Sequence, residues 1–352
     1  MICRTPTDRD SEILACADAA YKSDGLSPKP SKRVRDAEDF QTMGAAILGS
    51  QHFVSASIPS ILNTLGVTEW ILRNGAATTA LWEGSVGLWV NILLYARDGF
   101  SLVRRIFSEA NDIEPDKLFR PSLRALDELR VLAIFAPFLG TDISAQVEPT
   151  ITAVDASSRV AAVVSATVDK EVARELWRHR SRRATSRGAL QSKPPEELAA
   201  AAGGPEERAI AAAVGDLVDD DDEANDCAPT WVAELADGLA WSCDVQFRVS
   251  QTEHINLKEG RPLRSVTRRA LARCVDGPRR HLTLSDSSVN VGARARGRSP
   301  SPRLNALLRD TAPEQLVLEL QVGVIKVETE FNPADAPTRG RTVRNGPRSR
   351  LR

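Results

Sequence analysis

Apolar residues recur every three to four positions across 57–138, which is the spacing of helices that bury one face. Short polar breaks that contain Gly75 and Gly99 separate neighbouring apolar runs, so consecutive helices are expected to be antiparallel. The pattern predicts a small helical bundle. Three tryptophans are expected in its core: Trp70, Trp82 and Trp89.

After residue 149 the apolar positions change to the alternation of strands. Helical periodicity returns at 255–273, where Gly260 and Pro262 are expected to weaken the first turn, and again at 302–308. This order of elements predicts an α/β fold, with a mixed sheet and flanking helices. The predicted strands are 150–154, 160–166, 243–249, 281–285 and 322–327.

Charge divides the chain more sharply than its total suggests. The whole sequence has 46 Lys and Arg against 47 Asp and Glu, a net charge of −1. Residues 258–352 hold 20 basic and 9 acidic residues, a net charge of +11, so the first 257 residues carry −12. In the C-terminal part arginines alternate with apolar residues, which is typical of a folded basic face and indicates a nucleic-acid partner.

Two segments lack this periodicity. Residues 196–237 contain 13 acidic residues and one arginine, and this composition predicts a partly disordered acidic insertion at about 167–240. Within it, 172–179 has a helical pattern. Residues 1–44 are polar and are expected to be disordered or a remnant of something longer, whereas 341–352 forms a basic tail.

Other classes of protein are excluded by simpler features. The five cysteines show no spacing typical of a zinc site or a disulfide framework. The most apolar stretch, 79–96, contains Glu83 and Asn91 and is too short and polar to span a bilayer. Because the N-terminus also lacks the pattern of a secretion signal, we expect an intracellular protein, cytoplasmic or nuclear, with no membrane partner.

Four carboxylates lie where elements begin or end. Asp155 and Asp286 follow predicted strands, Asp335 lies in a loop, and Glu259 lies on a predicted helix. Hard oxygen ligands of this kind suit Mg²⁺. Each also has a structural interpretation: Asp155 as a turn cap, Asp286 and Asp335 as helix N-caps, and Glu259 as a residue displaced from the site.

The sequence stretches around these carboxylates resemble, in the same order along the chain, motifs of the ribonuclease H domain of retroelement polyproteins. They are ITAVDAS at 151–157, HINLKEGRPL at 254–263, LTLSDSSVNVGARARGRSPSPRLN at 282–305 and NPADAPTRG at 332–340. The resemblance covers about 150–340, and 45–140 resembles the thumb and connection region that precedes this domain in reverse transcriptases. No Tyr-x-Asp-Asp motif of a polymerase palm occurs, so we expect a truncated element.

The resemblance implies a fold, an activity and a site. The fold is a ribonuclease H-like mixed five-stranded sheet, preceded by the helical bundle. The activity is endonucleolytic hydrolysis of the RNA strand of an RNA–DNA hybrid with two Mg²⁺ ions, or Mn²⁺. Asp155 would bridge both ions, Glu259 and Asp286 would share one, and Asp335 would hold the other. Contacts to the nucleic acid are expected from Arg294, Arg296, Arg298, Arg303, Asn305 and Arg339.

Departures from the family pattern leave two functions open. Arg159 and Ala161 stand in a hairpin where the family usually has glycines, and the span from Asp155 to Glu259 is longer than a compact domain needs. The chain is therefore either an active hybrid ribonuclease or a degenerate, non-catalytic copy that binds nucleic acid through its basic C-terminal part.

Overall fold

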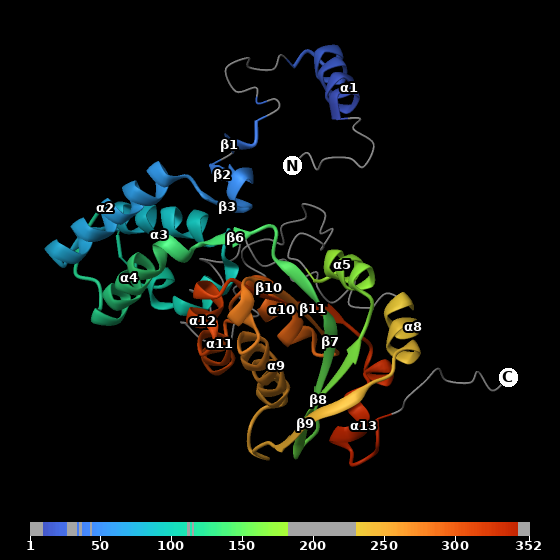
Figure 1. The fold of residues 1–352 in the computed structure, drawn as a ribbon. Helices are drawn as coiled ribbons and strands as arrows, with labels where there is room; N and C mark the ends of the chain where they lie inside the picture. Colours follow the sequence, from blue (N-terminus) through green and yellow to red (C-terminus); the bar gives the residue numbers. More distant parts are fainter. Residues whose placement is uncertain are drawn as a thin grey trace.

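A mixed five-stranded sheet forms the centre of the C-terminal half of the protein (Figure 1). Its strands are β7 (Gln146–Ala156), β8 (Val160–Thr167), β9 (Ser242–Arg248), β10 (Arg279–Ser285) and β11 (Leu320–Lys326). In the computed structural model, which describes residues 10–26, 34, 37–42, 44–110, 113–114, 116–181 and 230–343, they lie in the order β11-β10-β7-β8-β9. β10 pairs in parallel with β7 and β11, and the other pairs are antiparallel. The predicted mixed five-stranded sheet is confirmed.

Helices cover both faces of this sheet, because successive side chains of the central strands are buried on opposite sides. Val154 packs on one face against Leu263 and Val291. Ala153, the residue before it, lies on the other face in a cluster with Ile151 and Trp177. The first face is covered by α9 (Ile255–Leu271) and α10 (Ser288–Arg296), the second by α5 (Lys170–Arg178) and α8 (Thr230–Gly238).

The segment predicted as a partly disordered acidic insertion supplies that second helical layer. The helix expected at 172–179 is α5, and a second helix, α8, returns to the sheet at the far end of the segment. The rings of His179 and Trp231 lie 5.1 Å apart and join the two helices. The acidic run at 219–223 lies outside the described residues. The two ends of the insertion are therefore part of the core, because they bury apolar surface that the sheet would otherwise expose.

The helix expected at 255–273 forms as α9, with Gly260 and Pro262 inside it. α9 is continuous, and the Nδ1 atom of its N-cap residue His254 accepts a hydrogen bond from the backbone N–H of Asn256 at 3.3 Å. Gly260 has a packing role, because a Cβ at this position would lie 3.0 Å from Asn290 Oδ1 and from Leu307 Cδ1. The glycine lets α9 approach the following helices closely.

A buried polar network ties the sheet together at the edge where β7 and β10 begin. His281, fully buried on β10, contacts Glu148 Oε2 through Nδ1 at 2.6 Å and Thr152 Oγ1 through Nε2 at 3.0 Å. Arg273, just after α9, donates two hydrogen bonds to the Glu148 carboxylate, at 3.1 and 2.8 Å. These contacts hold the pKa of Glu148 at about 2, although burial opposes them.

Of the four apolar runs with helical spacing in the N-terminal half, the one that contains Phe100 and Phe107 forms two 3-10 helices, η3 (Arg97–Leu102) and η4 (Arg105–Phe107). The other three form α-helices: α2 (Ile58–Asn74), α3 (Thr79–Leu93) and α4 (Leu123–Phe135). A serine or threonine caps the N-terminus of each of these α-helices, because its hydroxyl accepts a hydrogen bond from a backbone N–H of the first turn. Trp82 and Trp89 are buried as expected, and Trp89 Nε1 donates to Thr68 Oγ1 at 2.9 Å. Among the described residues, no helix is long and apolar enough to cross a membrane.

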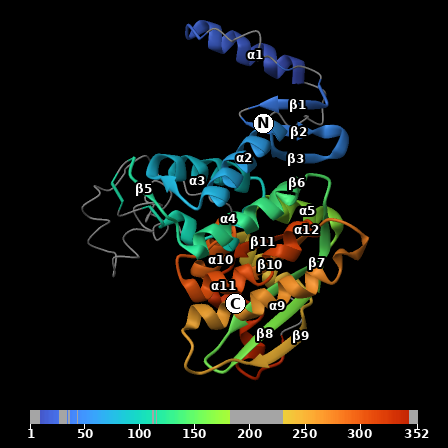
Figure 2. The same cartoon turned by 90° about the vertical axis from the view of Figure 1, so that its left-hand side faces the viewer.

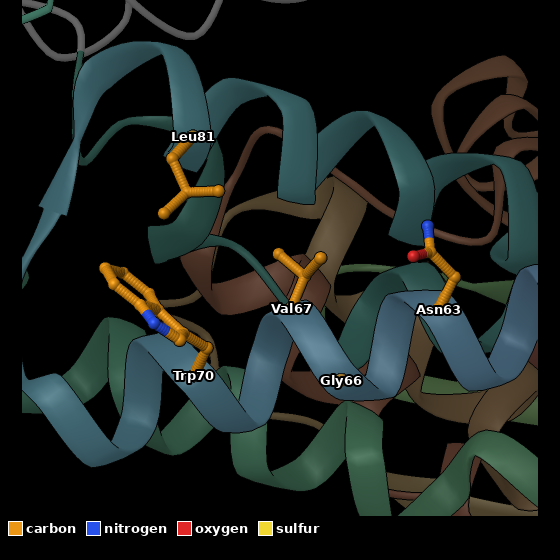
Figure 3. A pocket seen from close by; sticks show the side chains of 5 residues that line it. All are labelled: Asn63, Gly66, Val67, Trp70 and Leu81. Atoms are coloured by element: carbon orange, nitrogen blue, oxygen red, sulfur yellow. The ribbon is translucent and has the colours of Figure 1, made fainter.

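Trp70 does not belong to this core, contrary to the prediction. Its exposed fraction is 50%, and it lies on the rim of an open groove of about 340 Å³ between α2 and α3 (Figure 3). The helical period alone could not separate Trp70 from its buried neighbour Ile71. The groove is lined by Asn63, Gly66, Val67, Trp70 and Leu81.

The N-terminal half contains two further features that the sequence did not predict. Residues 1–44 were expected to be disordered or a remnant of something longer, and in their described part the structure has a helix and a strand, α1 (Asp10–Ser23) and β1 (Asp39–Thr42). The region 45–140 also contains strands, because β1 continues into an antiparallel sheet in the order β1-β2-β3-β6. These strands have three or four residues each, too few to show an alternation in sequence. The remaining strands are β2 (Ala45–Leu48), β3 (Phe53–Ala56), β4 (Ala77–Thr78), β5 (Leu118–Phe119) and β6 (Gly140–Asp142).

The two halves pack directly against each other (Figure 2). The contact is made by the 3-10 helix η3 (Arg97–Leu102) with α10, α11 (Pro302–Arg309) and α12 (Ala312–Val317). Leu316 of α12, a helix the sequence did not predict, joins the core of the N-terminal half. A Cβ at Gly297 would lie 1.9 Å from the carbonyl oxygen of Arg97, so the end of α10 must be glycine to pack so closely.

Candidate functional site

Four elements bring the predicted carboxylates to one edge of the five-stranded sheet. Asp155 is the penultimate residue of β7, and Asp286 directly follows β10. Because Ser285 of β10 is the partner of Val154 in the parallel β7–β10 pair, Asp286 lies beside Asp155. Glu259 lies in the second turn of α9. Asp335 is the first residue of the short helix α13 (Asp335–Thr338), which packs against β7 and β8.

Asp155 is the most deeply buried of the four, with an exposed fraction of 8%. Burial raises the pKa of its carboxyl to about 6, and the nearby charges of Asp286 and Asp335 add to this rise. The Thr338 hydroxyl donates a hydrogen bond to Asp155 Oδ2 at 2.8 Å and acts in the opposite direction, because it favours the charged form.

The pKa of Glu259 is raised in the same way. Burial is the largest cause, and repulsion by Asp286 and by Asp155 raises the pKa further. The side chains of Ser287 and Asn290 interact with Glu259 and partly offset the rise. Asp155, Glu259 and Asp286 therefore lie within electrostatic range of one another, and an added cation would relieve their repulsion.

Asn332 connects this site to the loop before α13, a role that the sequence did not reveal. Its Nδ2 atom donates to the carbonyl oxygen of Val154 at 3.0 Å and to Asp286 Oδ1 at 3.2 Å, and its Oδ1 accepts from the backbone N–H of Ala334. Asn332 is the first residue of the NPAD stretch, which was the available signal. It positions Asp286 and the start of α13 relative to β7.

Thr338, at the end of α13, was likewise missed, and its hydroxyl gives a testable result. Thr338→Val is expected to raise the pKa of Asp155 above about 6, because it removes a donor that favours the carboxylate. An NMR titration of the aspartate carboxyl carbons in metal-free protein measures this. Thr338→Ser keeps the hydroxyl and should leave the pKa near its native value; an unchanged pKa in the valine variant would refute the role of Thr338.

Asp335 differs from the other three carboxylates because it forms an ion pair with an arginine side chain. Arg339 Nε donates to Asp335 Oδ1 at 2.8 Å. Among the described residues, no three His, Cys, Asp or Glu side chains lie in positions that could hold a metal ion as they stand. The chemistry of the donor set nevertheless fits Mg²⁺, because all four side chains offer carboxylate oxygens.

The helix-cap alternatives for Asp286 and Asp335 and the turn-cap alternative for Asp155 do not match the structure. Ser287 caps α10, because its hydroxyl accepts from the backbone N–H of Asn290, and Asp286 precedes it. Asp335 lies inside α13, whose N-cap residue is Ala334. At the turn after β7, Ser157 Oγ accepts from the backbone N–H of Val160 at 3.1 Å. The cap functions that the sequence left open are therefore made by neighbouring residues.

Two of the predicted nucleic-acid contacts are wrong, because both side chains are buried between the halves of the protein. Arg294 has an exposed fraction of 7% and forms an ion pair with Asp98 at 3.4 Å. Asn305 donates to the carbonyl oxygen of Ser101 at 2.9 Å and accepts from the backbone N–H of Ser299. Both residues stabilise the contact with η3 and cannot reach a phosphate.

The other four candidates differ in accessibility. Arg298 is partly buried and lies over the rings of Phe107 and Phe100, 4.9 and 5.8 Å from their centres. Arg296 is also partly buried, whereas Arg303 and Arg339 are exposed. The exposed pair is retained as candidate phosphate contacts.

Comparison with known proteins adds little to this geometry. No protein-family model matches the chain, and no curated protein matches it. A solved structure described as the foamy viral protease-reverse transcriptase in complex with an RNA/DNA hybrid is 12% identical, with a TM-score of 0.26. The match covers 92% of this chain, which spans 56% of the length of that neighbour. A similarity at this level establishes neither a shared fold nor a shared activity, so the functional case rests on the residues themselves.

Proposed function

We propose that this chain is a retroelement-derived ribonuclease H-like nuclease that hydrolyses the RNA strand of RNA–DNA hybrids. The observation that carries the proposal is the meeting of Asp155, Glu259 and Asp286 at one sheet edge, with Asp335 beside them. Each of the four lies in one of the sequence stretches that resemble that family. Burying interacting carboxylates is costly for stability and is typical of a functional site.

The proposed roles are those that the resemblance to the ribonuclease H domain implies for these four positions. Asp155 would contact two Mg²⁺ ions, Glu259 and Asp286 would hold one of them, and Asp335 would hold the other. When bound, the ions would activate the attacking water and stabilise the leaving oxygen. Asp335 would first have to exchange Arg339 for the ion, after which the guanidinium becomes available to a phosphate.

A second function is favoured by the same ion pair. If the ion pair between Arg339 and Asp335 persists and Asp335 binds no metal ion, the chain would bind nucleic acid without cleaving it, as expected for a degenerate copy. Arg303 and Arg339 would then contribute to binding through the phosphate backbone alone.

A cleavage assay separates the two functions. A duplex with a labelled RNA strand and an unlabelled DNA strand is incubated with the native chain and Mg²⁺, with chelator and with an all-DNA duplex as controls. We expect RNA fragments only from the hybrid and only with the metal. Binding of the hybrid without cleavage would reject the nuclease and support the non-catalytic binder.

A further inference from the structure

Many basic side chains of the C-terminal part interact with other residues of the same chain. Every arginine between residues 261 and 294 has a partner within the chain. Arg280 donates to the carbonyl oxygens of Asp142 and Ile143, and the others form ion pairs with carboxylates. These pairs are Arg261 with Glu253, Arg264 and Arg268 with Asp310, Arg269 with Asp244, Arg273 with Glu148, Arg279 with Asp276, and Arg294 with Asp98.

Two arginines near the carboxylates differ from these. Arg159 lies in the turn between β7 and β8, and Arg248 is the last residue of β9. Both side chains are exposed, and neither has an ion-pair or hydrogen-bond partner among the residues that the structure describes. The backbone N–H of Val249 donates to the carbonyl oxygen of Arg159 at 2.9 Å, so the two arginines lie on adjacent chain segments.

The register of β9 places Arg248 on the same face of the sheet as Asp155. Val245 and Phe247 pack toward the face covered by α9, whereas Gln246 Nε2 donates to the carbonyl oxygen of Pro337 in α13. Because side chains alternate along a strand, Arg248 shares the face of Gln246. Asp155 contacts α13 through Thr338 and therefore lies on this face too.

The spacing between the two positions suits a nucleic-acid strand. Arg248 pairs with Val160, and Asp155 pairs with Ala162, so Arg248 lies two strands across and two residues along from Asp155. Strand geometry makes this about 12 Å between Cα atoms, roughly the axial rise of three to four nucleotides. A strand cut at the carboxylates would therefore reach Arg248 a few phosphates away.

The turn that carries Arg159 is fixed in place by a buried cation. Lys258, with an exposed fraction of 6%, donates from Nζ to the carbonyl oxygens of Ser158 and Gln251, at 3.1 and 3.2 Å. The turn therefore holds Arg159 on the segment next to Arg248. Like charges on neighbouring strands repel each other, and a bound anion would relieve this repulsion.

We infer that Arg159 and Arg248 form a phosphate-binding pair for the hybrid, beside the carboxylates and away from the basic helices that the sequence favours. This inference rests on the proposed function, because its ligand is the strand presented to Asp155. It assigns a binding role to Arg159, which occupies a position where the family that this sequence resembles usually has glycine.

The test measures binding separately from cleavage. The dissociation constant of a short fluorescein-labelled RNA–DNA hybrid is determined by anisotropy in EDTA over a series of salt concentrations. For the double variant Arg159→Gln/Arg248→Gln, the slope of log K against log salt should fall by about two, or about one per lost phosphate contact. Affinity at low salt should fall by about 10- to 100-fold.

Arg309→Gln is the matched control. Arg309 is exposed at the end of α11 and has no side-chain partner in the described part of the chain, so this variant loses the same charge elsewhere. Its slope should equal the native slope. An equal loss in this variant, or an unchanged slope in the double variant, would overturn the phosphate-binding pair and leave the nuclease standing.

Two further outcomes separate the inference from the proposed function. A native chain that binds the hybrid, loses two phosphate contacts in the double variant and never cleaves would reject the nuclease but support the arginine pair. A native chain that binds no hybrid at all would reject both.

Discussion

Asp155→Asn should abolish hybrid cleavage, lowering the rate by about 10³-fold or more, because residues that act as one catalytic unit lose most of its effect when one is removed. The same substitution should make the metal-free protein more stable. An asparagine can still accept the Thr338 hydrogen bond, but it carries no charge to be buried beside Asp286. Loss of activity with a gain in stability is the signature of a residue kept for function.

The size and pH dependence of that gain follow from the raised pKa of Asp155. A rise of the pKa from 3.8 to about 6 means that the charged form costs about 3 kcal/mol in the folded protein. The protonated carboxyl stabilises the native fold fully below the ordinary pKa, and this contribution is lost as pH rises through about 6. The free energy of unfolding of the native chain should therefore fall as the pH rises from 3.8 to about 6, and that of the Asp155→Asn variant should not.

Cleavage rates and urea unfolding midpoints above and below the pKa measure both effects. Asp127→Asn is the control, because Asp127 forms an exposed ion pair with Arg130 on α4, and its loss should change neither quantity appreciably. Undiminished cleavage by Asp155→Asn would place the activity elsewhere in the chain. A sharp fall in its stability would instead make Asp155 a structural residue.

Glu148→Gln should lower the free energy of unfolding by about 1–3 kcal/mol, the usual cost of leaving a buried hydrogen-bond partner unsatisfied, because the Arg273 side chain is 43% exposed and can be solvated by water. Glu148 is 4% exposed, and glutamine would leave Arg273 without its carboxylate and His281 without its charged partner. The depressed pKa of Glu148 has the opposite pH dependence to Asp155. Its contribution is full above the ordinary value of 4.5 and is lost as pH falls through about 2.

Urea unfolding over the acid range measures this prediction. Glu171→Gln serves as the control, because Glu171 forms an exposed pair with Arg174 and its loss should cost less than about 1 kcal/mol. If both variants lost equal stability, the buried network would contribute no more than a surface pair. Cleavage should survive in Glu148→Gln at temperatures where the variant is folded, because the network lies at the opposite edge of the sheet from Asp155.

Sequence periodicity predicted the sheet well, because its strands are long enough for alternation or continuous burial to be visible. It could not predict β1, β2, β3 and β6, since strands of three or four residues leave no pattern and β6 lies far along the chain from the others. The same limit applies to Trp70, whose exposure depends on how α2 and α3 approach each other and not on its own helix.

The four candidate carboxylates were grouped by the resemblance of the sequence stretches around them, because their positions at the ends of elements gave only a weak signal. The parallel pairing of β7 with β10, which places Asp286 beside Asp155, was not visible in the sequence. Partners could not be predicted: Arg339 for Asp335 and Thr338 for Asp155 depend on a turn geometry that sequence does not specify. Arg294 and Asn305 were misassigned because their burial depends on η3, about two hundred residues earlier in the chain.

The parallel pairing of β10 with β7 also sets the order in which the protein can fold. The hydrogen bond from Thr152 Oγ1 to the carbonyl oxygen of Leu282 spans 130 positions, and those from Asn332 to Val154 and from Thr338 to Asp155 span 178 and 183 positions. Closing such long loops is slow and is favourable only after local helices and the β7–β8 hairpin exist. The carboxylate edge is therefore expected to be among the last parts of the molecule to form, after the chain has been synthesised through α13.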